Sequence, residues 1–508
     1  MLDARFRGKP TIRLHPNDNV VVATARLAKG TTLTDESITI LEDAPFGHKI
    51  ATAEIAAGAA VRKYGQVIGV ATEAIPAGRH VHTHNLTVSD LRVDAGASAA
   101  WSRNEPLRSF MGYRRANGRV GVRNYIGVLT SVNCSATVAR HIAEATEKQG
   151  LLSAFPGVDG VVPITHGSGC GMASSGEGFE LLKRTLWGTA ANPNFGAILM
   201  VGLGCEVMQI ARLKEEFGIE DEDEFHSFTI QDVGGTRRAV DEGLDRLRAL
   251  LPIVNRASRS SLPASEIVLG LQCGGSDAWS GITSNPALGN ASDRLVAMGG
   301  TVLLSETPEI YGAEHLLNAR SVSAQVSSKL AARLKWWEHY TRIHGAEMNN
   351  NPSPGNKAGG LSTILEKSLG AVAKGGTSPL NDVIEYAELV RARGLVFMDS
   401  PGFDPCSATG QVASGATMIA FTTGRGSAYG CKPSPSIKLS SNTEIYTRMK
   451  DDIDLDCGTI ASGSASVEEK GEEIVEYLLA VASGKKSKSE ELGYGGVEFV
   501  PWQIGAVM

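Results

Sequence analysis

The residues that could do chemistry most directly are alternating histidines, in the run His80-Val81-His82-Thr83-His84. Successive side chains of a β-strand point to opposite faces, so His82 and His84 would share one face, with His80 on the same side. Neutral imidazoles on one face can bind a single divalent ion. The alternative interpretation is a polar strand face exposed to solvent. The pattern predicts His82 and His84 as metal ligands.

Four of the seven cysteines share a setting, because each follows an apolar run and precedes glycine or another small residue: Cys134, Cys170, Cys205 and Cys273. The carboxyl ends of parallel strands are where α/β folds place ligand sites. One interpretation is thiolate ligation of a metal or an iron–sulfur cluster. The other is that cysteine is a small side chain that fits tight turns. The wide spacing and the lack of a CxxC pair argue against disulfides and a zinc ribbon.

Charged side chains in unusual loops suit an anionic substrate. Arg425, Lys432 and Lys357 lie among glycine, serine or proline residues, where a cation could hold a carboxylate. Glu306 and Asp277 follow apolar runs and could bind metal or act as bases, although either could instead cap a helix. Several glycine-rich loops would let backbone amides approach an anion. None is a dinucleotide fingerprint or a P-loop, so no nucleotide cofactor is predicted.

Three domains are expected to position these residues, in an α/β fold. Residues 1–92 contain short strands and turns that predict a small β-rich domain, and the polar stretch 93–109 is typical of a linker. In residues 110–260 and again in 261–508, apolar runs alternate with loops and helical stretches, which indicates two α/β domains with largely parallel sheets. Residues 345–360 predict an irregular loop, and the sequence 466–486 predicts an amphipathic helix before the C-terminal tail.

Composition narrows the classes of partner. A chain of 508 residues with 42% hydrophobic and 20% charged residues can bury a sizeable core in more than one domain. The net charge of -6 and the lack of a basic run argue against nucleic acid, and no apolar segment is long enough to cross a membrane. The N-terminus lacks a signal-like apolar region, so a cytoplasmic protein is expected. A homodimer is expected from the general frequency of such assemblies.

Six long strings extend over most of the chain: YRRANGRVGVRN, VDGVVPITHGSGCG, NPNFGAILMVGLGCE, LQCGGSDAWSGITSNPALG, NPSPGNKAGGLSTILEKSLG and QVASGATMIAFTTGRGSAYG. In sequence and in order they resemble the family of the altronate and galactarate dehydratases, which also includes the sulfolactate sulfo-lyases. The N-terminal domain resembles the SAF domain of that family.

The resemblance implies dehydration of a sugar acid, of the altronate or galactarate type, to a 2-keto-3-deoxy acid. It also implies a divalent metal, Fe²⁺ or Mn²⁺. The predicted site lies where the SAF domain meets the α/β region. The predicted metal ligands are His82, His84, Glu306 and Cys205. The predicted general base is His166, with Lys357 second, and the predicted substrate contacts are Arg425, Lys432, Asn356, Ser276 and Asp277. The alternatives are a sulfo-lyase acting on sulfolactate and a noncatalytic protein that binds a sugar acid.

Overall fold

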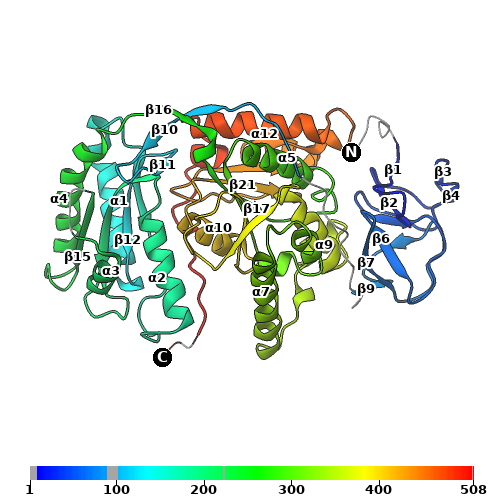
Figure 1. The fold of residues 1–508 in the computed structure, drawn as a ribbon, viewed down its shortest axis with the longest axis horizontal. Coiled ribbons are helices and arrows are strands. Elements are labelled where there is room, and N and C mark those ends of the chain that lie inside the picture. Colours follow the sequence, from blue (N-terminus) through cyan, green and yellow to red (C-terminus); the bar gives the residue numbers. More distant parts are fainter. Residues whose placement is uncertain (1–8, 89–100, 221–223, 506, 508) are drawn as a thin grey trace.

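The computed structural model describes residues 9–88, 101–220, 224–505 and 507. Figure 1 shows three bodies in a row, with a small β domain at one end, a large α/β domain in the centre and a second α/β domain at the other end. Parts of the predicted first domain (1–8 and 89–92) and of the predicted linker (93–100) lie outside the described residues.

The N-terminal domain is built from short antiparallel strands, as its alternating short apolar runs predict. One sheet has the order β1-β2-β5-β8, a second has the order β6-β7-β9, and β3 pairs with β4. The strands are β1 (Thr11–Ile12), β2 (Val20–Ala23), β3 (Thr32–Leu33), β4 (Ile38–Thr39), β5 (Lys49–Ala51), β6 (Ala60–Lys63), β7 (Gln66–Ala71), β8 (His80–Val81) and β9 (Leu86–Thr87).

A small antiparallel sheet of order β11-β10-β16 connects the two α/β domains, because β10 (Ser109–Arg114) leads into the middle domain and β16 (Ser260–Pro263) leads out of it. Its third strand is β11 (Val120–Gly121). The ends of the middle domain are thus held side by side by backbone pairing between β10 and β16.

The middle domain is a parallel sheet of order β13-β12-β14-β15 between helices. Every residue of its central strand β12 is buried, as expected for a parallel strand covered on both faces. The elements are β12 (Tyr125–Thr130), α1 (Ala136–Lys148), β13 (Gly160–Ile164), α2 (Glu177–Ala190), β14 (Phe195–Gly202), α3 (Ile210–Phe217), β15 (Phe225–Thr229) and α4 (Thr236–Val254), with 3₁₀ turns η2 (Asn133–Ser135) and η3 (Leu151–Ala154).

The C-terminal domain contains a seven-stranded parallel sheet of order β19-β20-β18-β17-β21-β22-β23. The chain moves from β17 to one side of the sheet and later crosses to β21 on the other side, so a topological switch point lies between these two strands. The strands are β17 (Val268–Cys273), β18 (Thr301–Ser305), β19 (Leu380–Ile384), β20 (Gly394–Met398), β21 (Met418–Thr423), β22 (Ser436–Ser440) and β23 (Leu455–Asp456).

Helices cover both faces of this sheet, which confirms the expected α/β class. They are α5 (Ser284–Ala297), α6 (Glu314–Asn318), α7 (Ala324–Ile343), α8 (Pro354–Ala358), α9 (Ile364–Val372), α10 (Asp404–Ala413), α11 (Thr443–Arg448), α12 (Val467–Ala482) and α13 (Lys488–Glu491). The 3₁₀ turns are η4 (Ala264–Glu266), η5 (Thr307–Glu309), η6 (Met348–Asn350), η7 (Ala373–Gly375) and η8 (Gly458–Ile460). No helix in the described ranges is long and apolar enough to cross a membrane.

The structure tests two expectations about local structure, one for the C-terminal helix and one for residues 345–360. The C-terminal amphipathic helix is confirmed as α12, which begins after Ser466 in a capping box with Glu469. The irregular loop expected at 345–360 is wrong in part, because this segment contains η6 and the short helix α8. A second capping box, formed by Ser353 and Asn356 around Pro354, starts α8 despite the high content of Asn, Pro and Gly.

The N-terminal domain is joined to the C-terminal domain through one buried carboxylate. Glu366, in the first turn of α9, accepts hydrogen bonds from the Lys49 ammonium at 2.9 and 3.1 Å and from the Lys63 ammonium at 2.9 Å. All three side chains are at most 1% exposed. Lys49 also donates to the Gly360 carbonyl oxygen at 2.8 Å. Burial by itself would raise the pKa of Glu366, but the two ammonium groups hold it well below its usual range.

We expect Glu366→Ala to destabilise this joint by about 3–5 kcal/mol, because it leaves two ammonium groups buried without a counter-charge. Calorimetry and hydrogen exchange of the β5, β6 and α9 amides measure the loss. The matched control is Glu144→Ala, which removes an exposed i,i+4 pair with Lys148 and should change little. A triple replacement of Lys49, Lys63 and Glu366 by apolar residues should recover part of the loss. Normal stability of Glu366→Ala would contradict the assignment.

Candidate active site

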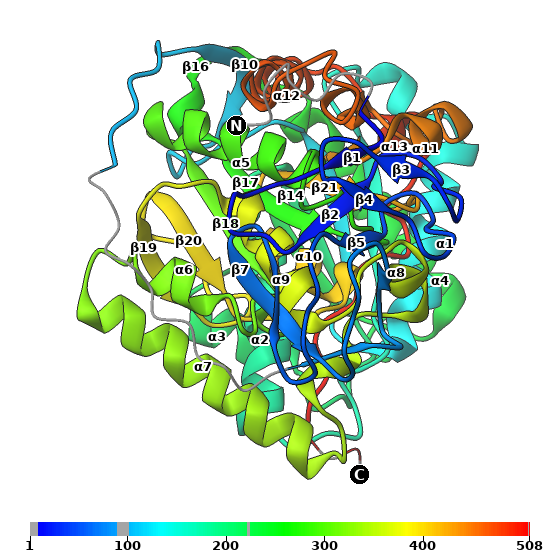
Figure 2. The same cartoon turned by 90° about the vertical axis from the view of Figure 1, so that its right-hand side faces the viewer.

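A cluster of imidazoles lies on the N-terminal domain where it meets the C-terminal domain. His48 immediately precedes β5, and His80 begins β8, which pairs with β5. The His48 Nδ1 and His80 Nε2 atoms are 2.9 Å apart, and one ring nitrogen from each of His48, His80 and His82 lies within 4.8 Å of the others. Figure 2 looks onto this domain, with β5 close to α8 and α9 in the view.

The local backbone that presents these rings is a turn. Strand β8 ends at Val81, and the chain then turns so that the Asn85 amide donates to the His82 carbonyl oxygen at 3.0 Å. The buried Asn85 side chain closes the turn, because its Oδ1 accepts from the His82 amide and its Nδ2 donates to the His80 carbonyl oxygen. The alternation argument for His82 and His84 is therefore wrong in detail, since His82 and His84 lie in this turn and not on a strand.

The turn separates the two histidines that the sequence grouped together. His82 joins His48 and His80, whereas His84 lies in a second group with Glu42 and His80. The predicted pair is thus replaced by a trio that contains one of its members. His48 directly precedes β5 and carries no sequence signal of its own, so only the pairing of β5 with β8 brings it to the site.

The trio suits a metal ion on two counts. The His48 Nδ1 and His80 Nε2 atoms lie at hydrogen-bonding distance, 2.9 Å, which is also close to the separation of about 3 Å expected for two nitrogens bound at right angles to one ion with bonds of about 2.1 Å. Burial, together with the neighbouring imidazoles and Lys49, lowers the pKa of His80 to about 3 and that of His82 to about 4. The rings are therefore neutral at physiological pH, which is the form that coordinates metal.

The C-terminal domain approaches the trio through the segment between α8 and α9. The His48 Nε2 atom is 3.5 Å from the Ala358 carbonyl oxygen, and the Ser362 hydroxyl is 3.5 Å from the His82 Nδ1 atom. This close approach needs glycine, because a side chain at Gly360, where φ is +97°, would begin 2.7 Å from the Gly47 carbonyl oxygen. Lys357 lies on α8, immediately before Ala358, and is partly exposed.

Three of the predicted substrate contacts form the framework behind this segment. The Asn356 side chain donates to the Ser276 carbonyl oxygen at 2.8 Å and caps α8. The Asp277 carboxylate is buried and accepts hydrogen bonds from Ser280, Ser441 and Asn442. Asn356 therefore ties α8 to the loop after β17, and Asp277 stabilises that loop. Both side chains make these hydrogen bonds to other groups of the protein.

The predicted cations Arg425 and Lys432 are not brought together. Arg425 follows β21 at the switch point, where its amide donates to the Gly275 carbonyl oxygen at 2.9 Å, and its side chain is exposed. Lys432 precedes β22 and so lies at the opposite, amino edge of the sheet, since β21 and β22 are parallel. Lys432 therefore cannot act with Arg425 on one small substrate.

Glu306 lies in a second, fully buried cluster at the carboxyl edge of the same sheet. One ligand atom from each of Cys273, Glu306 and Glu309 lies within 4.8 Å of the others. The Lys374 ammonium is 2.8 Å from the Cys273 sulfur, and the Lys367 ammonium is 2.6 Å from a Glu309 oxygen. Glu306 has a φ of +75°, and neither of its carboxylate oxygens has a hydrogen-bond partner. Burial and the nearby Glu309 raise the pKa of Glu306 well above its usual range.

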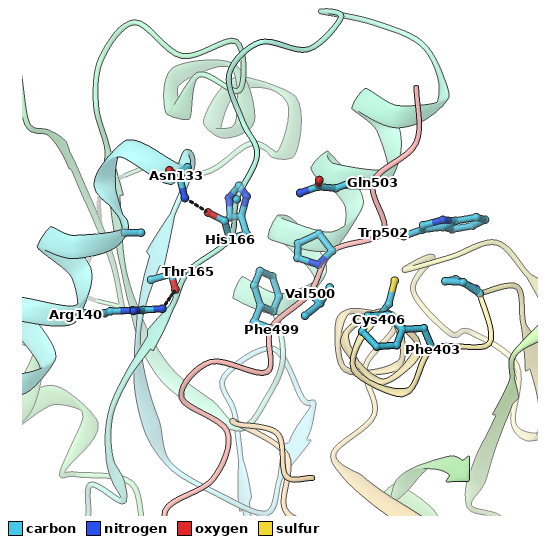
Figure 3. A pocket seen from close by; sticks show the side chains of 14 residues that line it. Asn133, Arg140, Thr165, His166, Phe403, Cys406, Phe499, Val500, Trp502 and Gln503 are labelled. Atoms are coloured by element: carbon cyan, nitrogen blue, oxygen red, sulfur yellow. Dashed lines mark hydrogen bonds between the residues drawn. The ribbon is translucent and has the colours of Figure 1, made fainter. Parts of the chain in front are cut away.

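His166 and Cys205 belong to the middle domain, on the far side of the C-terminal domain from the histidine trio. His166 lines a cavity of about 540 Å³ between the middle domain, the C-terminal tail and the α10 region of the C-terminal domain (Figure 3). Its Nε2 is 3.0 Å from the Thr130 carbonyl oxygen, and its Nδ1 accepts from the Ser168 amide at 3.2 Å. Both ring nitrogens are engaged, so His166 cannot serve as the base at the trio. Cys205 is exposed in another loop of the same domain.

Comparison with known proteins covers nearly the whole chain. The family descriptions that match are the altronate/galactarate dehydratase SAF domain over residues 9–89, the D-galactarate dehydratase/altronate hydrolase second domain over 112–255, and the D-galactarate/altronate dehydratase C-terminal domain over 264–507. These bounds coincide closely with the three bodies of the structure.

Individual relatives agree with this assignment. The galactarate dehydratase (L-threo-forming) of Escherichia coli is 38% identical over 94% of this chain and 93% of its own length. The altronate dehydratase of the same organism is 36% identical over 94% of this chain and 96% of its own length. The (2R)-sulfolactate sulfo-lyase subunit beta of Chromohalobacter salexigens is 31% identical over 76% of this chain and 96% of its own length. The chain belongs to the altronate/galactarate dehydratase family of hydro-lyases.

Proposed function

We propose that the protein dehydrates a sugar acid of the altronate or galactarate type, giving a 2-keto-3-deoxy acid, with a divalent ion held by His48, His80 and His82. The observation that carries the proposal is that these three neutral imidazoles meet at a domain joint, where His48 and His82 approach Ala358 and Ser362 of the C-terminal domain. The names of two relatives with more than 90% mutual coverage support the substrate class.

The reaction removes the proton next to the carboxylate and expels the hydroxyl group on the next carbon. What a bound divalent ion, Fe²⁺ or Mn²⁺, would supply is Lewis acidity for the charge that develops in both steps. The chain itself must orient the substrate, keep water out and take the proton. Lys357 is the favoured base, because it lies on α8 beside the Ala358 carbonyl oxygen that approaches His48.

The first test follows the reaction products. Anaerobically purified protein, loaded with Fe²⁺ or Mn²⁺, is incubated separately with D-altronate, galactarate and sulfolactate, and 2-keto acid and sulfite are measured. We expect keto acid from one of the two sugar acids, no sulfite, and loss of turnover with a chelator. Release of sulfite would instead identify a sulfo-lyase, and turnover unaffected by chelator would exclude the metal.

The second test addresses the ligands. Alanine replacement of His48, His80 or His82 should each remove bound metal and lower kcat/KM by at least about 10–100-fold, the loss typical even of residues that only support a ligand. His84→Ala should have a smaller effect, because His84 lies outside this trio. The control is His141→Ala, which changes an exposed histidine of α1 and should leave metal content and kcat/KM unchanged. Full metal content in all three variants would contradict the proposed site.

The third test separates two roles of Lys357. As a base, Lys357→Arg should lower kcat by about 10²–10⁴-fold with little change in KM, because the charge is kept but the proton acceptor is lost. If Lys357 only holds the substrate carboxylate, Lys357→Arg should stay active while Lys357→Met raises KM. The matched control is Lys335→Arg, on the exposed side of α7. Normal kinetics in both Lys357 variants would remove this residue from the mechanism.

A further inference from the structure

The middle domain presents three exposed cysteines at one edge of its sheet. Cys134 follows β12, Cys170 follows β13 and Cys205 follows β14, and these are three adjacent parallel strands. All three thiols are free and exposed, whereas Cys273, Cys406 and Cys457 of the C-terminal domain are buried. Exposed thiols are more readily oxidised than buried ones. Three of them at one edge of a sheet therefore suggest a chemical role.

Backbone hydrogen bonds hold the three cysteine loops together. The Asn133 amide, next to Cys134, donates to the Ser168 carbonyl oxygen at 2.9 Å. The Val207 and Met208 amides, just after Cys205, donate to the Gly169 carbonyl oxygen at 3.0 and 3.1 Å. The loop that contains Cys170 is thus hydrogen bonded to the loops that contain the other two cysteines.

The conformation of these loops is tightly determined. Gly169 has a φ of +99°, and a side chain there would begin 2.2 Å from the Ser131 carbonyl oxygen, so only glycine allows this approach. The buried Glu206 carboxylate accepts from the Ser131 hydroxyl at 2.6 Å and from the Gly204 amide at 2.6 Å. Glu206 therefore fixes the turn that leaves the neighbouring Cys205 pointing outward.

We propose that Cys134, Cys170 and Cys205 ligate an iron–sulfur cluster at this edge of the middle domain. Thiolates are soft ligands that select iron–sulfur clusters, zinc or copper(I) over hard cations. A single tetrahedral ion with bonds of about 2.3 Å would need the sulfurs about 4 Å apart. These sulfurs are not among the groups of the described residues whose ligand atoms lie within 4.8 Å. The inorganic sulfides of a cluster let its thiolate ligands stand farther apart.

The surroundings of the sulfurs are compatible with a cluster. The Gln231 side chain donates to the Cys205 sulfur at 3.6 Å, and hydrogen bonds to sulfur are one way a protein adjusts the reduction potential of a cluster. Binding would release the three thiol protons, since the thiolate is the ligating form. Three cysteines leave one iron of a [4Fe–4S] cluster for a ligand that is not a cysteine. This site is separate from the histidine trio, which lies beyond the C-terminal domain.

The test is anaerobic reconstitution of the full-length protein with ferrous iron and sulfide, read by visible absorption, electron paramagnetic resonance, and iron and sulfide analysis. We expect about four irons and four sulfides per chain. The variants Cys134→Ser, Cys170→Ser and Cys205→Ser should each lose most of the iron and sulfide, and the triple variant should lose all of it. Each variant is first checked for a normal thermal transition.

Two controls make the result specific. Cys431→Ser, which changes a partly buried residue of the C-terminal domain, and His82→Ala, in the trio, should both keep the cluster. Absence of a cluster in the wild type, its retention in the triple variant, or binding of zinc without sulfide would each overturn the proposal. The readout is spectroscopic, so it stands or falls independently of any assay of dehydration.

Discussion

The arrangement of this protein depends on a buried carboxylate, that of Glu366, between two ammonium groups of another domain. A buried ion pair is costly to desolvate, and it is tolerated only where the charges satisfy each other and the remaining hydrogen bonds are made. Here both conditions hold, because Glu366 also accepts from the Ser362 amide and Lys49 donates to the Gly360 carbonyl oxygen. Any displacement of the N-terminal domain would separate these charges in a medium of low dielectric constant.

This constraint determines where the histidine trio lies. Lys49 follows His48 directly in the sequence, and Ser362 precedes Glu366 on the approach to α9. The contacts that bring imidazoles to the C-terminal domain and the contacts that join the domains therefore share one strand and one loop. The rings of Phe46 and Trp279, stacked at 5.1 Å between centroids, add an aromatic contact between the two domains two residues before His48.

The two α/β domains use the same edge of their sheets for different purposes. In the C-terminal domain, Cys273 and Glu306 are buried in a network with two lysines, and Glu306 adopts a strained backbone conformation without hydrogen bonds to its carboxylate. In the middle domain, the corresponding edge is open and carries free thiols. Cysteines in the same sequence setting, at or after the end of an apolar strand, are thus buried in one domain and exposed in the other. The sequence pattern therefore could not distinguish a metal-binding cysteine from a small side chain in a tight turn.

The sequence by itself determined the class of fold, the helix α12 and the family, because buried parallel strands, capping residues and long characteristic strings are local signals. It also pointed to the histidine-rich segment and to the segment of Asn356 and Lys357, which folds as α8. Only the tertiary structure decided which residues meet. His48 joins the trio through strand pairing, whereas His166, Cys205 and Lys432 lie elsewhere, because contacts between distant segments depend on how domains pack and not on the spacing of residues along the chain.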